Sequence, residues 1–533
     1  MNPLLLVDSY KIHHTKMYPE GMTLLYSNFT PRKSRIAGVD KVVVFGLQHF
    51  IKEYLIKQFN ENFFLTRFRE GGIYEDNVTE SDVINLKNEI IEEYKRNCPV
   101  NTKHIEALWD LGYLPIEVKA LSEGTKCPIG VPLLTIKNTH PDFGWLVNYL
   151  ETLISCQLWQ PITSATIANQ YYELLTKYAV ETTGNSEGVQ WQGHDFSMRG
   201  MSSVESSILS GMGHLLSFTG TDTIPAIYAL ERSYNGNGLI GASVPATEHS
   251  VMCVGKKESE LETFRRLLEL YPTGILSVVS DTWNLWDVIK KGGLCDQLKE
   301  EILSRDGKLV IRPDSGDPVD IICGTSTTLV PDEAPISRNH KYEAKGVIEL
   351  LWDLFGGTVN ELGYKVLDSH IGAIYGDSIT LDRAKNICER LKAKGFASTN
   401  IVLGIGSYTY QYNTRDTFGF AMKATYGEIT TESSYDTFGI PCVGGVECRE
   451  IFKDPITDDG TKKSKKGLLC IEKAYSNDGK GNTKEIGLIC IDQQTWAQEE
   501  QGELKTVFKD GKLVIETTLD EIRNRLKPNE ASK

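Results

Sequence analysis

Long hydrophobic runs are absent from this sequence. Crossing a bilayer takes roughly 20 consecutive apolar residues, and no run here approaches that length. The apolar stretch Pro3-Leu-Leu-Leu-Val7 is short and is followed at once by Asp8, unlike the apolar region of a secretory signal. We therefore expect a soluble, cytoplasmic protein with no membrane partner.

Paired cysteines and an excess of positive charge are also missing. The eleven cysteines are scattered without a Cys-X-X-Cys pair, which predicts separate thiols in a reducing compartment and no disulfide framework or zinc site. The formal net charge of −14 argues against nucleic acid as a partner, because phosphates would be repelled over most of the surface. A phosphate-bearing ligand therefore needs a local cationic pocket.

What is present is the composition of a large globular protein. The 533 residues are 40% hydrophobic and 24% charged, enough for two or more domains with substantial cores. A short strand is predicted at 24–26, and apolar residues at helical spacing predict helices over 46–59 and 145–159. Near the C-terminus, the Asp-Gly pair inside 506–515 predicts a hairpin.

The sequence pattern changes in the middle of the chain, from about residue 190 to about residue 425. Short apolar segments that end in polar, glycine-bearing loops alternate there with helical stretches, which is typical of βα units and of a parallel sheet or barrel. The clearest predicted strands are residues 276–281, 308–311, 371–375 and 400–403.

Glycine loops follow the last two of these strands. Gly376-Asp377 follows one strand, and Gly404-Ile-Gly-Ser407 follows the other. In (β/α) barrels the loops after the final strands commonly hold phosphate, because glycine lets backbone N–H groups approach. The position therefore predicts phosphate binding, although a tight turn at 404–407 or helix caps at Asp281 and Asp377 would give the same pattern.

The segment Ile311-Arg-Pro-Asp-Ser-Gly-Asp-Pro318 carries the strongest chemical signal. It places a fixed cation and carboxylates immediately after the apolar run 309–311. An α/β enzyme presents charge at the mouth of its sheet in this way. Together with the glycine loops, the segment indicates an enzyme that handles a phosphorylated sugar.

Several longer motifs resemble, in type and in order, those of the nicotinamide phosphoribosyltransferase family, which belongs to the type II phosphoribosyltransferases. The resemblance spans the chain from about Asp8 to about Arg523. The motifs that carry it, besides 311–318, are Asp8-Ser-Tyr-Lys11, His194-Asp-Phe-Ser-Met-Arg-Gly200, Gly220-Thr-Asp-Thr223, Ser243-Val-Pro-Ala-Thr-Glu-His-Ser250, Ser280-Asp281, Gly376-Asp377 and Phe452-Lys-Asp-Pro455.

The resemblance implies a fold, an assembly and a reaction. The expected fold class is α/β: an irregular (β/α) barrel at 186–425, plus a mixed α+β domain built from 1–185 and 426–533. A homodimer with active sites shared between subunits is expected. The expected reaction joins nicotinamide and 5-phosphoribosyl 1-pyrophosphate to give nicotinamide mononucleotide and pyrophosphate, with Mg²⁺ as cofactor and ATP as co-substrate.

The resemblance also assigns residues to the phosphorylated sugar. Asp281 and Asp314 would face Mg²⁺, pyrophosphate and ribose, and Gly376 and Asp377 would hold ribose hydroxyls. The residues expected to contact phosphate, some from the partner subunit, are Arg32, Gly406, Ser407, Arg415, Lys423, Lys453 and Lys462. The lysines around Lys462 would otherwise form an ordinary solvated loop.

For the base, the resemblance predicts an aromatic slot. Phe196 and the partner's Tyr10 would sandwich the pyridine ring, since flat aromatic faces suit a flat heterocycle. Asp222 would accept a hydrogen bond from a carboxamide and repel the carboxylate of nicotinate. Further residues expected in the base pocket are Arg199, Ser243 and Arg312.

His249, preceded by Glu248, matches the family histidine that accepts phosphate from ATP. An imidazole suits that role because its basicity lies near neutrality. Without its motif, His249 would ordinarily be interpreted as a structural histidine. Phe196 without its motif would ordinarily be interpreted as a core residue.

The chain departs from the family pattern at the phosphate loop and at two further positions. Ile405, Ser407 and Tyr408 stand where relatives have more glycine, which predicts a differently shaped phosphate loop. Met198 replaces an aromatic residue, and Ala421 replaces a phosphate-contacting serine.

Three alternatives remain open on the sequence. A nicotinate phosphoribosyltransferase would use the same fold. A non-catalytic dimeric binding module would not need Arg312, Asp314, Asp377 and His249 together. An unrelated phosphate-binding barrel would leave Tyr10, Phe196 and Asp222 without a shared purpose.

Overall fold

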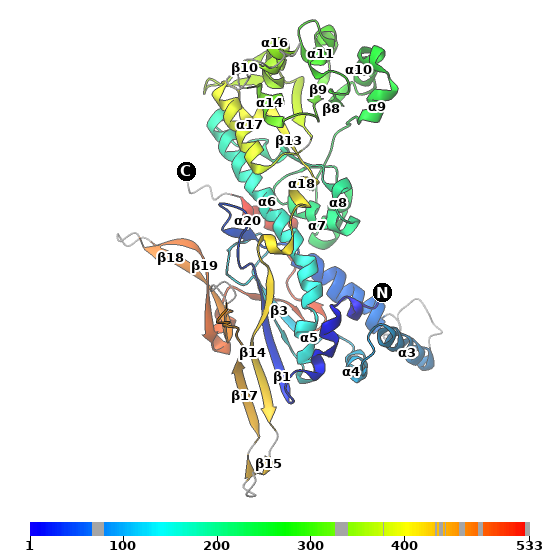
Figure 1. The fold of residues 1–533 in the computed structure, drawn as a ribbon, viewed down its shortest axis with the longest axis vertical. Helices are drawn as coiled ribbons and strands as arrows, with labels where there is room; N and C mark the ends of the chain where they lie inside the picture. The colour runs from blue at the N-terminus through cyan, green and yellow to red at the C-terminus, as the bar shows by residue number, and fades with distance from the viewer. Residues whose placement is uncertain are drawn as a thin grey trace. The chain divides into compact units, whose positions relative to one another are not determined.

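The chain forms two compact units (Figure 1). The first combines Met1–Thr166, Ala229–Gly236 and Asn413–Lys533, and the second combines Ile167–Tyr228 and Asn237–Tyr412. The predicted division at 185 and 425 stays a prediction. The computed structural model describes residues 1–66, 79–325, 339–376, 378–431, 434–435, 441–442, 444–457, 464–477 and 483–527. Within these ranges, no helix has the length and apolarity needed to cross a membrane.

An antiparallel sheet of seven strands organises the first unit, in the order β17-β14-β1-β5-β3-β20-β21. The central strand β1 pairs with β14 on one side and with β5 on the other, so strands from both ends of the chain share one sheet. The strands are β1 Met22–Thr30, β3 Ile116–Ala120, β5 Leu134–Asn138, β14 Ala421–Thr431, β17 Gly445–Glu450, β20 Lys505–Lys509 and β21 Lys512–Leu513. Shorter pairs are β2 Lys41–Val43 with β4 Lys126–Pro128, β15 Ser434–Tyr435 with β16 Pro441–Cys442, and β18 Leu468–Asn477 with β19 Thr483–Gln494.

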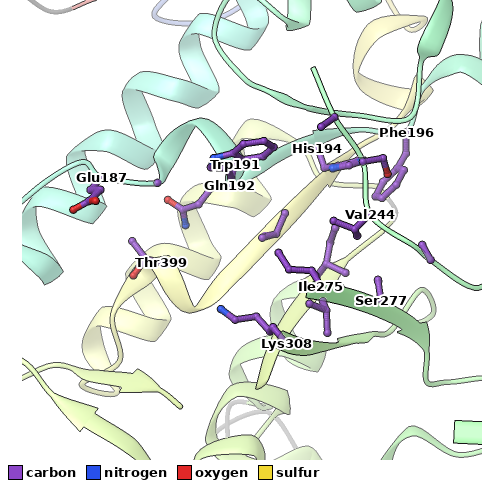
Figure 2. Close-up of a pocket in the computed structure, with 17 residues that line it drawn as sticks. Glu187, Trp191, Gln192, His194, Phe196, Val244, Ile275, Ser277, Lys308 and Thr399 are labelled. Carbon is purple, nitrogen blue, oxygen red and sulfur yellow. The ribbon is translucent and has the colours of Figure 1, made fainter. Parts of the chain in front are cut away.

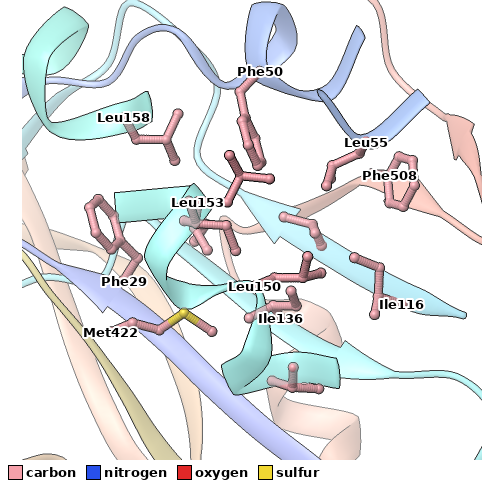
Figure 3. Close-up of a cluster of buried hydrophobic side chains, with 14 of the residues drawn as sticks. Phe29, Phe50, Leu55, Ile116, Ile136, Leu150, Leu153, Leu158, Met422 and Phe508 are labelled. Atoms are coloured by element: carbon pink, nitrogen blue, oxygen red, sulfur yellow. The ribbon is translucent and has the colours of Figure 1, made fainter. Parts of the chain in front are cut away.

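Helices pack their apolar faces on this sheet. Figure 3 shows Leu150 and Leu153 pointing toward Ile136 and Met422, whose strands form the floor of the core. Burial of these side chains is the main source of stability for the unit. The helices are η2 Ser9–Lys16, α1 Leu47–Phe50, η3 Ile51–Gln58, α3 Glu80–Asn97, α4 Lys103–Leu111, α5 Gly144–Tyr149, the first half of α6 Glu151–Thr183, α19 Trp496–Gln501 and α20 Leu519–Leu526.

A buried carboxyl group supports the start of the helix at Leu47. Glu123 is 6% exposed and accepts hydrogen bonds from the N–H groups of Gln48 at 2.7 Å and Gly46 at 3.4 Å. Burial raises the pKa of Glu123 to about 7, because the charged form loses its hydration.

Glu123→Gln is expected to reduce the pH dependence of stability. The folded-state pKa lies above the ordinary value of 4.5, so the stabilising protonation is complete below pH 4.5 and is lost as pH rises through 7. The wild-type chain should therefore lose on the order of 2 kcal/mol between mildly acidic and mildly alkaline pH from this group. Urea unfolding at several pH values measures the difference; equal slopes against pH in both proteins would contradict it.

A parallel sheet of six strands forms the second unit, in the order β7-β6-β13-β12-β9-β8. The strands are β6 Gly193–Asp195, β7 Gly220–Thr221, β8 Thr273–Val279, β9 Asp306–Arg312, β12 Ile371–Tyr375 and β13 Ile401–Ile405. The segment after β7 joins the two edges, because Ala242 pairs in parallel with Gly220 and Ala246 pairs in parallel with Ser277. The sheet thereby curls into a barrel, and the predicted α/β barrel is confirmed.

Helices surround this barrel, as the green and yellow helices of Figure 1 show. They follow the strands in the βα rhythm that the sequence predicts. They are α7 Val204–His214, α8 Ile224–Tyr234 (whose second half belongs to the first unit), α9 His249–Val254, α10 Glu260–Leu270, α11 Leu285–Ile289, α12 Leu294–Gln297, α13 Lys299–Leu303, α14 Pro318–Cys323, α15 His340–Glu343, α16 Val347–Phe355, α17 Leu381–Ala393 and α18 Ser407–Tyr410. A small hairpin, β10 Gly357–Val359 with β11 Lys365–Leu367, completes the unit.

Two predicted helices differ from those observed. The helix predicted over 46–59 is α-helical only to Phe50 and continues as a π-helix from Ile51. The helix predicted over 145–159 is interrupted at Leu150 and then extends to Thr183 through Pro161. Proline usually ends a helix, so the local pattern gave no reason to continue it. The four barrel strands, the strand at 24–26 and the hairpin are confirmed.

Candidate active site

The candidate residues of the second unit collect at one edge of the barrel. Asp281, Phe196, Asp222, Gly376 and Gly406 all lie directly after, or within two residues of, the carboxyl end of a strand. The strands are parallel, so these ends meet at the same edge. The sequence placed these residues on loops, and the closed sheet brings their loops together.

Two acidic loops are joined through Asp281. Its Oδ2 atom accepts hydrogen bonds from the N–H of Asp314 at 2.8 Å and from the hydroxyl of Ser315 at 2.6 Å. Its buried Oδ1 has no hydrogen-bond partner in the described part of the chain and lies 3.6 Å from Nε2 of His249. Asp281 is therefore no helix cap, since Asn284 caps the next helix. His249 is 49% exposed and open to a ligand.

Arg312 connects this acidic group to the aromatic residue. Its guanidinium lies 5.5 Å from the centre of the Phe196 ring and donates to the carbonyl of Thr247 at 3.3 Å. Its buried Nε–H has no hydrogen-bond partner among the residues that the structure describes, and such a donor gains most from a ligand acceptor. A Cβ added at Gly376 would lie 3.5 Å from both Arg312 and Asp314, an ordinary van der Waals contact, so Gly376 is a neighbour of both side chains.

Asp222 sits in a hydrogen-bonded group of its own. Its Oδ1 atom receives Nε2 of His194 at 2.9 Å and the hydroxyl of Ser243 at 2.5 Å. Burial opposes its ionisation, but these two hydrogen bonds and the charge of Arg312 outweigh it and lower the pKa of the Asp222 carboxyl. The His194 ring lies 4.4 Å from the Phe196 ring, centre to centre. The Asp222 carboxylate and the aromatic slot at Phe196 are therefore neighbours.

A fully buried carboxylate holds the Asp222 loop in place. Asp195 accepts hydrogen bonds from the N–H of Ser197 and from the hydroxyl of Thr223. The carbonyl of Asp195 accepts the N–H of Asp222 at 2.9 Å. The two motifs Gly220–Thr223 and His194–Gly200 are therefore one structural element.

His214 links this element to the loop after β13. It is fully buried, with Nε2 at 3.0 Å from the carbonyl of Gly220 and Nδ1 at 2.7 Å from the hydroxyl of Tyr410. Burial lowers the pKa of His214 to about 4, so the ring is neutral. Nε2 then donates to Gly220, and Nδ1 accepts from Tyr410.

Tyr410→Phe is expected to destabilise the barrel by about 1–3 kcal/mol, because the buried Nδ1 of His214 loses its only hydrogen-bond donor. Urea unfolding measures the change. Tyr412→Phe is the matched control, since Tyr412 is 80% exposed; equal stabilities of the two variants would contradict the expectation.

The predicted phosphate loop packs against the loop that carries Arg199. A Cβ added at Gly200 would lie 2.1 Å from the Ser407 hydroxyl, so the Ser407 side chain packs against the backbone of Gly200. Gly406 precedes the short helix α18, which begins at Ser407. Arg199 itself is exposed at this turn. Gly406, Ser407 and Arg199 therefore belong to the same edge of the barrel.

The remaining phosphate candidates form a cationic group in the first unit. Burial lowers the pKa of Lys423, and the charges of Arg32, Lys453 and Arg415 lower it as well, while the charge of Glu151 raises it. An anion close to Lys423 would offset the repulsion from the neighbouring cations. That this group binds phosphate stays a prediction. Its place beside the barrel residues stays a prediction.

Tyr10 also belongs to the first unit. It is 59% exposed, while its neighbour Lys11 is buried and forms an ion pair with Glu151 at 2.6 Å. The pair fixes the helix that presents Tyr10. Its predicted role in the partner's site is untested, and Asp377 and Lys462 lie outside the described residues.

The barrel interior contains a cavity of about 530 Å³. Figure 2 shows His194 and Phe196 at one end, Glu187 and Thr399 at the other, and Lys308 along the lower side. Most of the walls between them are apolar, including Val244, Ile275 and other strand residues. The cavity therefore opens beside the aromatic slot at Phe196.

The acidic loops fit a magnesium ion only in part. No group of three or more His, Cys, Asp or Glu side chains suited to a metal occurs among the residues that the structure describes. Mg²⁺, however, usually takes one or two carboxylates and completes its shell with water and substrate phosphates. The unpartnered Oδ1 of Asp281, beside the Asp314 loop, supplies the type of oxygen donor required.

Comparison with known proteins places this site in a family. Residues 191–512 match the model of the nicotinate phosphoribosyltransferase (NAPRTase) family, and residues 2–102 match the nicotinamide phosphoribosyltransferase N-terminal domain. A nicotinamide phosphoribosyltransferase of Acinetobacter baylyi is 49% identical, covering 99% of this chain and 97% of the relative. The chain belongs to the nicotinamide phosphoribosyltransferase family.

More distant members of the nicotinamide phosphoribosyltransferase family cover most of the chain as well. The protein of that name from Mycoplasma pneumoniae is 36% identical over 86% of this chain and 94% of its own length. The one from Xanthomonas campestris is 31% identical over 98% and 97%. The family resemblance found in the motifs is thereby confirmed.

Sequence reasoning overlooked His194 as a candidate of the nicotinamide phosphoribosyltransferase site. A usable signal was present, because His194 lies on β6 only two residues before Phe196, which directly follows that strand. The links from Thr247 to Arg312 and from Tyr410 to His214 had no such signal, since both join distant parts of the chain.

Proposed function

We propose that this chain transfers the phosphoribosyl group of 5-phosphoribosyl 1-pyrophosphate to nicotinamide, giving nicotinamide mononucleotide and pyrophosphate in NAD salvage. Membership of the nicotinamide phosphoribosyltransferase family supports the reaction class. The single observation that carries the choice of nicotinamide is the ionised Asp222 beside Phe196. A carboxylate accepts a carboxamide N–H and repels the carboxylate of nicotinate, which disfavours nicotinate as the substrate.

The base would lie on Phe196 with its carboxamide between two polar groups. The unpartnered Nε–H of Arg312 would donate to the carboxamide oxygen, and Asp222 would accept from its nitrogen. This pair orients the pyridine nitrogen toward the ribose. Orientation of this kind supplies much of the rate, because the two reactants are held in an attacking geometry.

The sugar would lie over the acidic loops. Positive charge develops on the ribose as its bond to pyrophosphate breaks, and Asp281 and Asp314 would stabilise that charge. Gly376 leaves room for the ribose next to Arg312 and Asp314. Magnesium, when bound, would neutralise charge on the pyrophosphate.

The 5′-phosphate would need cations as well as the backbone N–H groups of the glycine loop. We assign it to Gly406 and Ser407 together with Arg415, and assign further phosphate contacts to Arg32, Lys423 and Lys453. The lowered pKa of Lys423, caused by burial and by the charges of Arg32, Lys453 and Arg415, supports this assignment. Tyr10 would complete the slot from the second subunit of a homodimer.

His249 would couple the reaction to ATP by accepting a phosphoryl group. Its exposure and its position 3.6 Å from Asp281 support that role, since the carboxylate orients the imidazole. The phosphorylated ring would add negative charge near the bound Mg²⁺ and so tighten binding of the substrates.

One experiment tests the proposed function. Purified protein is incubated with labelled nicotinamide, 5-phosphoribosyl 1-pyrophosphate and Mg²⁺, with and without ATP. We expect nicotinamide mononucleotide to form and ATP to lower the KM for nicotinamide. His249→Ala should keep the basal reaction and lose the ATP effect. Absence of product in every arm would contradict the function, and an ATP effect in His249→Ala would contradict the coupling.

A further inference from the structure

We infer that His194 is a positioning residue that sets the preference for a carboxamide over a carboxylate by fixing the Asp222 side chain. The inference rests on the proposed function and deepens it. His194 would not touch the reacting atoms. It would act through Asp222, which in turn faces the carboxamide.

The geometry leaves one oxygen of Asp222 for the substrate. Both His194 and Ser243 engage Oδ1, at 2.9 Å and 2.5 Å. With Oδ1 occupied, Oδ2 remains to accept a carboxamide N–H. A carboxylate held by two donors on one oxygen loses its rotational freedom, so the remaining acceptor points in one direction.

The position of His194 itself is built into the fold. Its side chain is 12% exposed, and its ring lies against Phe196 with a centre-to-centre distance of 4.4 Å. A Cβ added at Gly220 would lie 2.7 Å from Nδ1 of His194. Glycine at position 220 therefore makes room for the imidazole beside the loop that carries Asp222.

The hydrogen bond also keeps the carboxylate ionised. Burial favours the neutral acid at Asp222, and the His194 and Ser243 hydrogen bonds reverse that preference with help from the Arg312 charge. The buried His214 also interacts with His194, because the charge of His194 contributes to lowering the pKa of His214. Removal of the His194 donor should therefore raise the pKa of Asp222 and weaken its discrimination against nicotinate.

The test compares two substitutions at position 194. His194→Phe keeps a flat ring against Phe196 but removes the N–H donor, and His194→Gln keeps an N–H near the position of Nε2. For His194→Phe we expect the KM for nicotinamide to rise about tenfold, with kcat within about threefold, and the ratio of kcat/KM for nicotinamide over nicotinate to fall about tenfold. His194→Gln should recover most of both effects.

The pH profile separates positioning from mere packing. In His194→Phe the acid limb of kcat/KM for nicotinamide should move to higher pH, because Asp222 takes up its proton more readily. A loss of packing alone would leave that limb in place. His370→Phe is the matched control, since His370 forms a similar pair with Asp368, at 2.7 Å, just before the amino end of β12; it should change none of these quantities.

Failure of the inference is distinguishable from failure of the function. If the wild-type chain forms nicotinamide mononucleotide but Phe and Gln at position 194 behave alike, or the substrate ratio and the acid limb do not move, the inference is overturned and the function stands. If the wild-type chain is inactive, carbon NMR of labelled aspartates still tests the inference. Asp222→Asn assigns the Asp222 signal, and the pKa of Asp222 must be higher in His194→Phe than in the wild-type chain.

Discussion

Asp281→Asn is expected to lower kcat/KM by about 10²- to 10³-fold with little change in stability. The substitution keeps the shape of the side chain, and its amide oxygen can still accept from Asp314 and Ser315, which now hold Oδ2. It removes the negative charge and replaces the unpartnered Oδ1 with an N–H donor. A preorganised charge at a reacting centre is worth about this much. Initial rates at varied 5-phosphoribosyl 1-pyrophosphate measure the effect.

Asp287→Asn is the matched control for that substitution. Asp287 lies on the next helix, 52% exposed, and pairs with Lys290 on the surface. Surface pairs contribute little, so the rate should stay within about threefold of wild type. A similar rate for both variants, with both proteins folded by circular dichroism, would remove Asp281 from the reaction.

The grouping of site residues at one edge of the barrel could be predicted, because it depends on a local sequence pattern. Asp281, Arg312 and Gly376 each follow a run of apolar residues, and parallel strands deliver such loops to one edge. The strand assignments needed only the alternation of apolar runs and helices. The motifs then narrowed the chemistry to one family.

The connections among these loops could not be predicted, because they depend on contacts between distant residues. Nothing near Tyr410 indicates that its hydroxyl meets His214, 196 positions away. The closure of the barrel by the segment 242–246 could not be predicted either, since this segment forms only single bridges to Gly220 and Ser277. The long helix through Pro161 was missed because a local rule about proline was outweighed by tertiary packing.

The cationic group of the first unit illustrates an intermediate case. Arg32, Lys423 and Lys453 are far apart in the sequence, and only the resemblance nominated them as phosphate contacts. The strand pairing explains part of the grouping, because β1 and β14 are neighbours and Asn28 lies opposite Lys423. An excess of acidic residues over the whole chain thus coexists with a local group of cations.

Asp222→Ser is expected to change the substrate preference more than any other single substitution. The kcat/KM for nicotinamide should fall about 10²-fold, since the carboxamide N–H loses its charged acceptor. The kcat/KM for nicotinate should rise about tenfold, since the repulsion between two carboxylates disappears. The preference would then shrink by about 10³-fold. Parallel assays with both bases under the same conditions measure it.

Two further variants identify which property of Asp222 is responsible. Asp222→Asn keeps an acceptor of the same shape without the charge, so it should admit nicotinate while retaining more of the nicotinamide reaction than Asp222→Ser does. Ser243→Ala removes one hydrogen bond to Oδ1 but leaves the charge, so it should largely preserve the order of preference. If nicotinate remains excluded in both Asp222 variants, electrostatic repulsion at this position does not set the specificity, and the choice of the amide must arise from Arg312 or from the shape of the slot at Phe196.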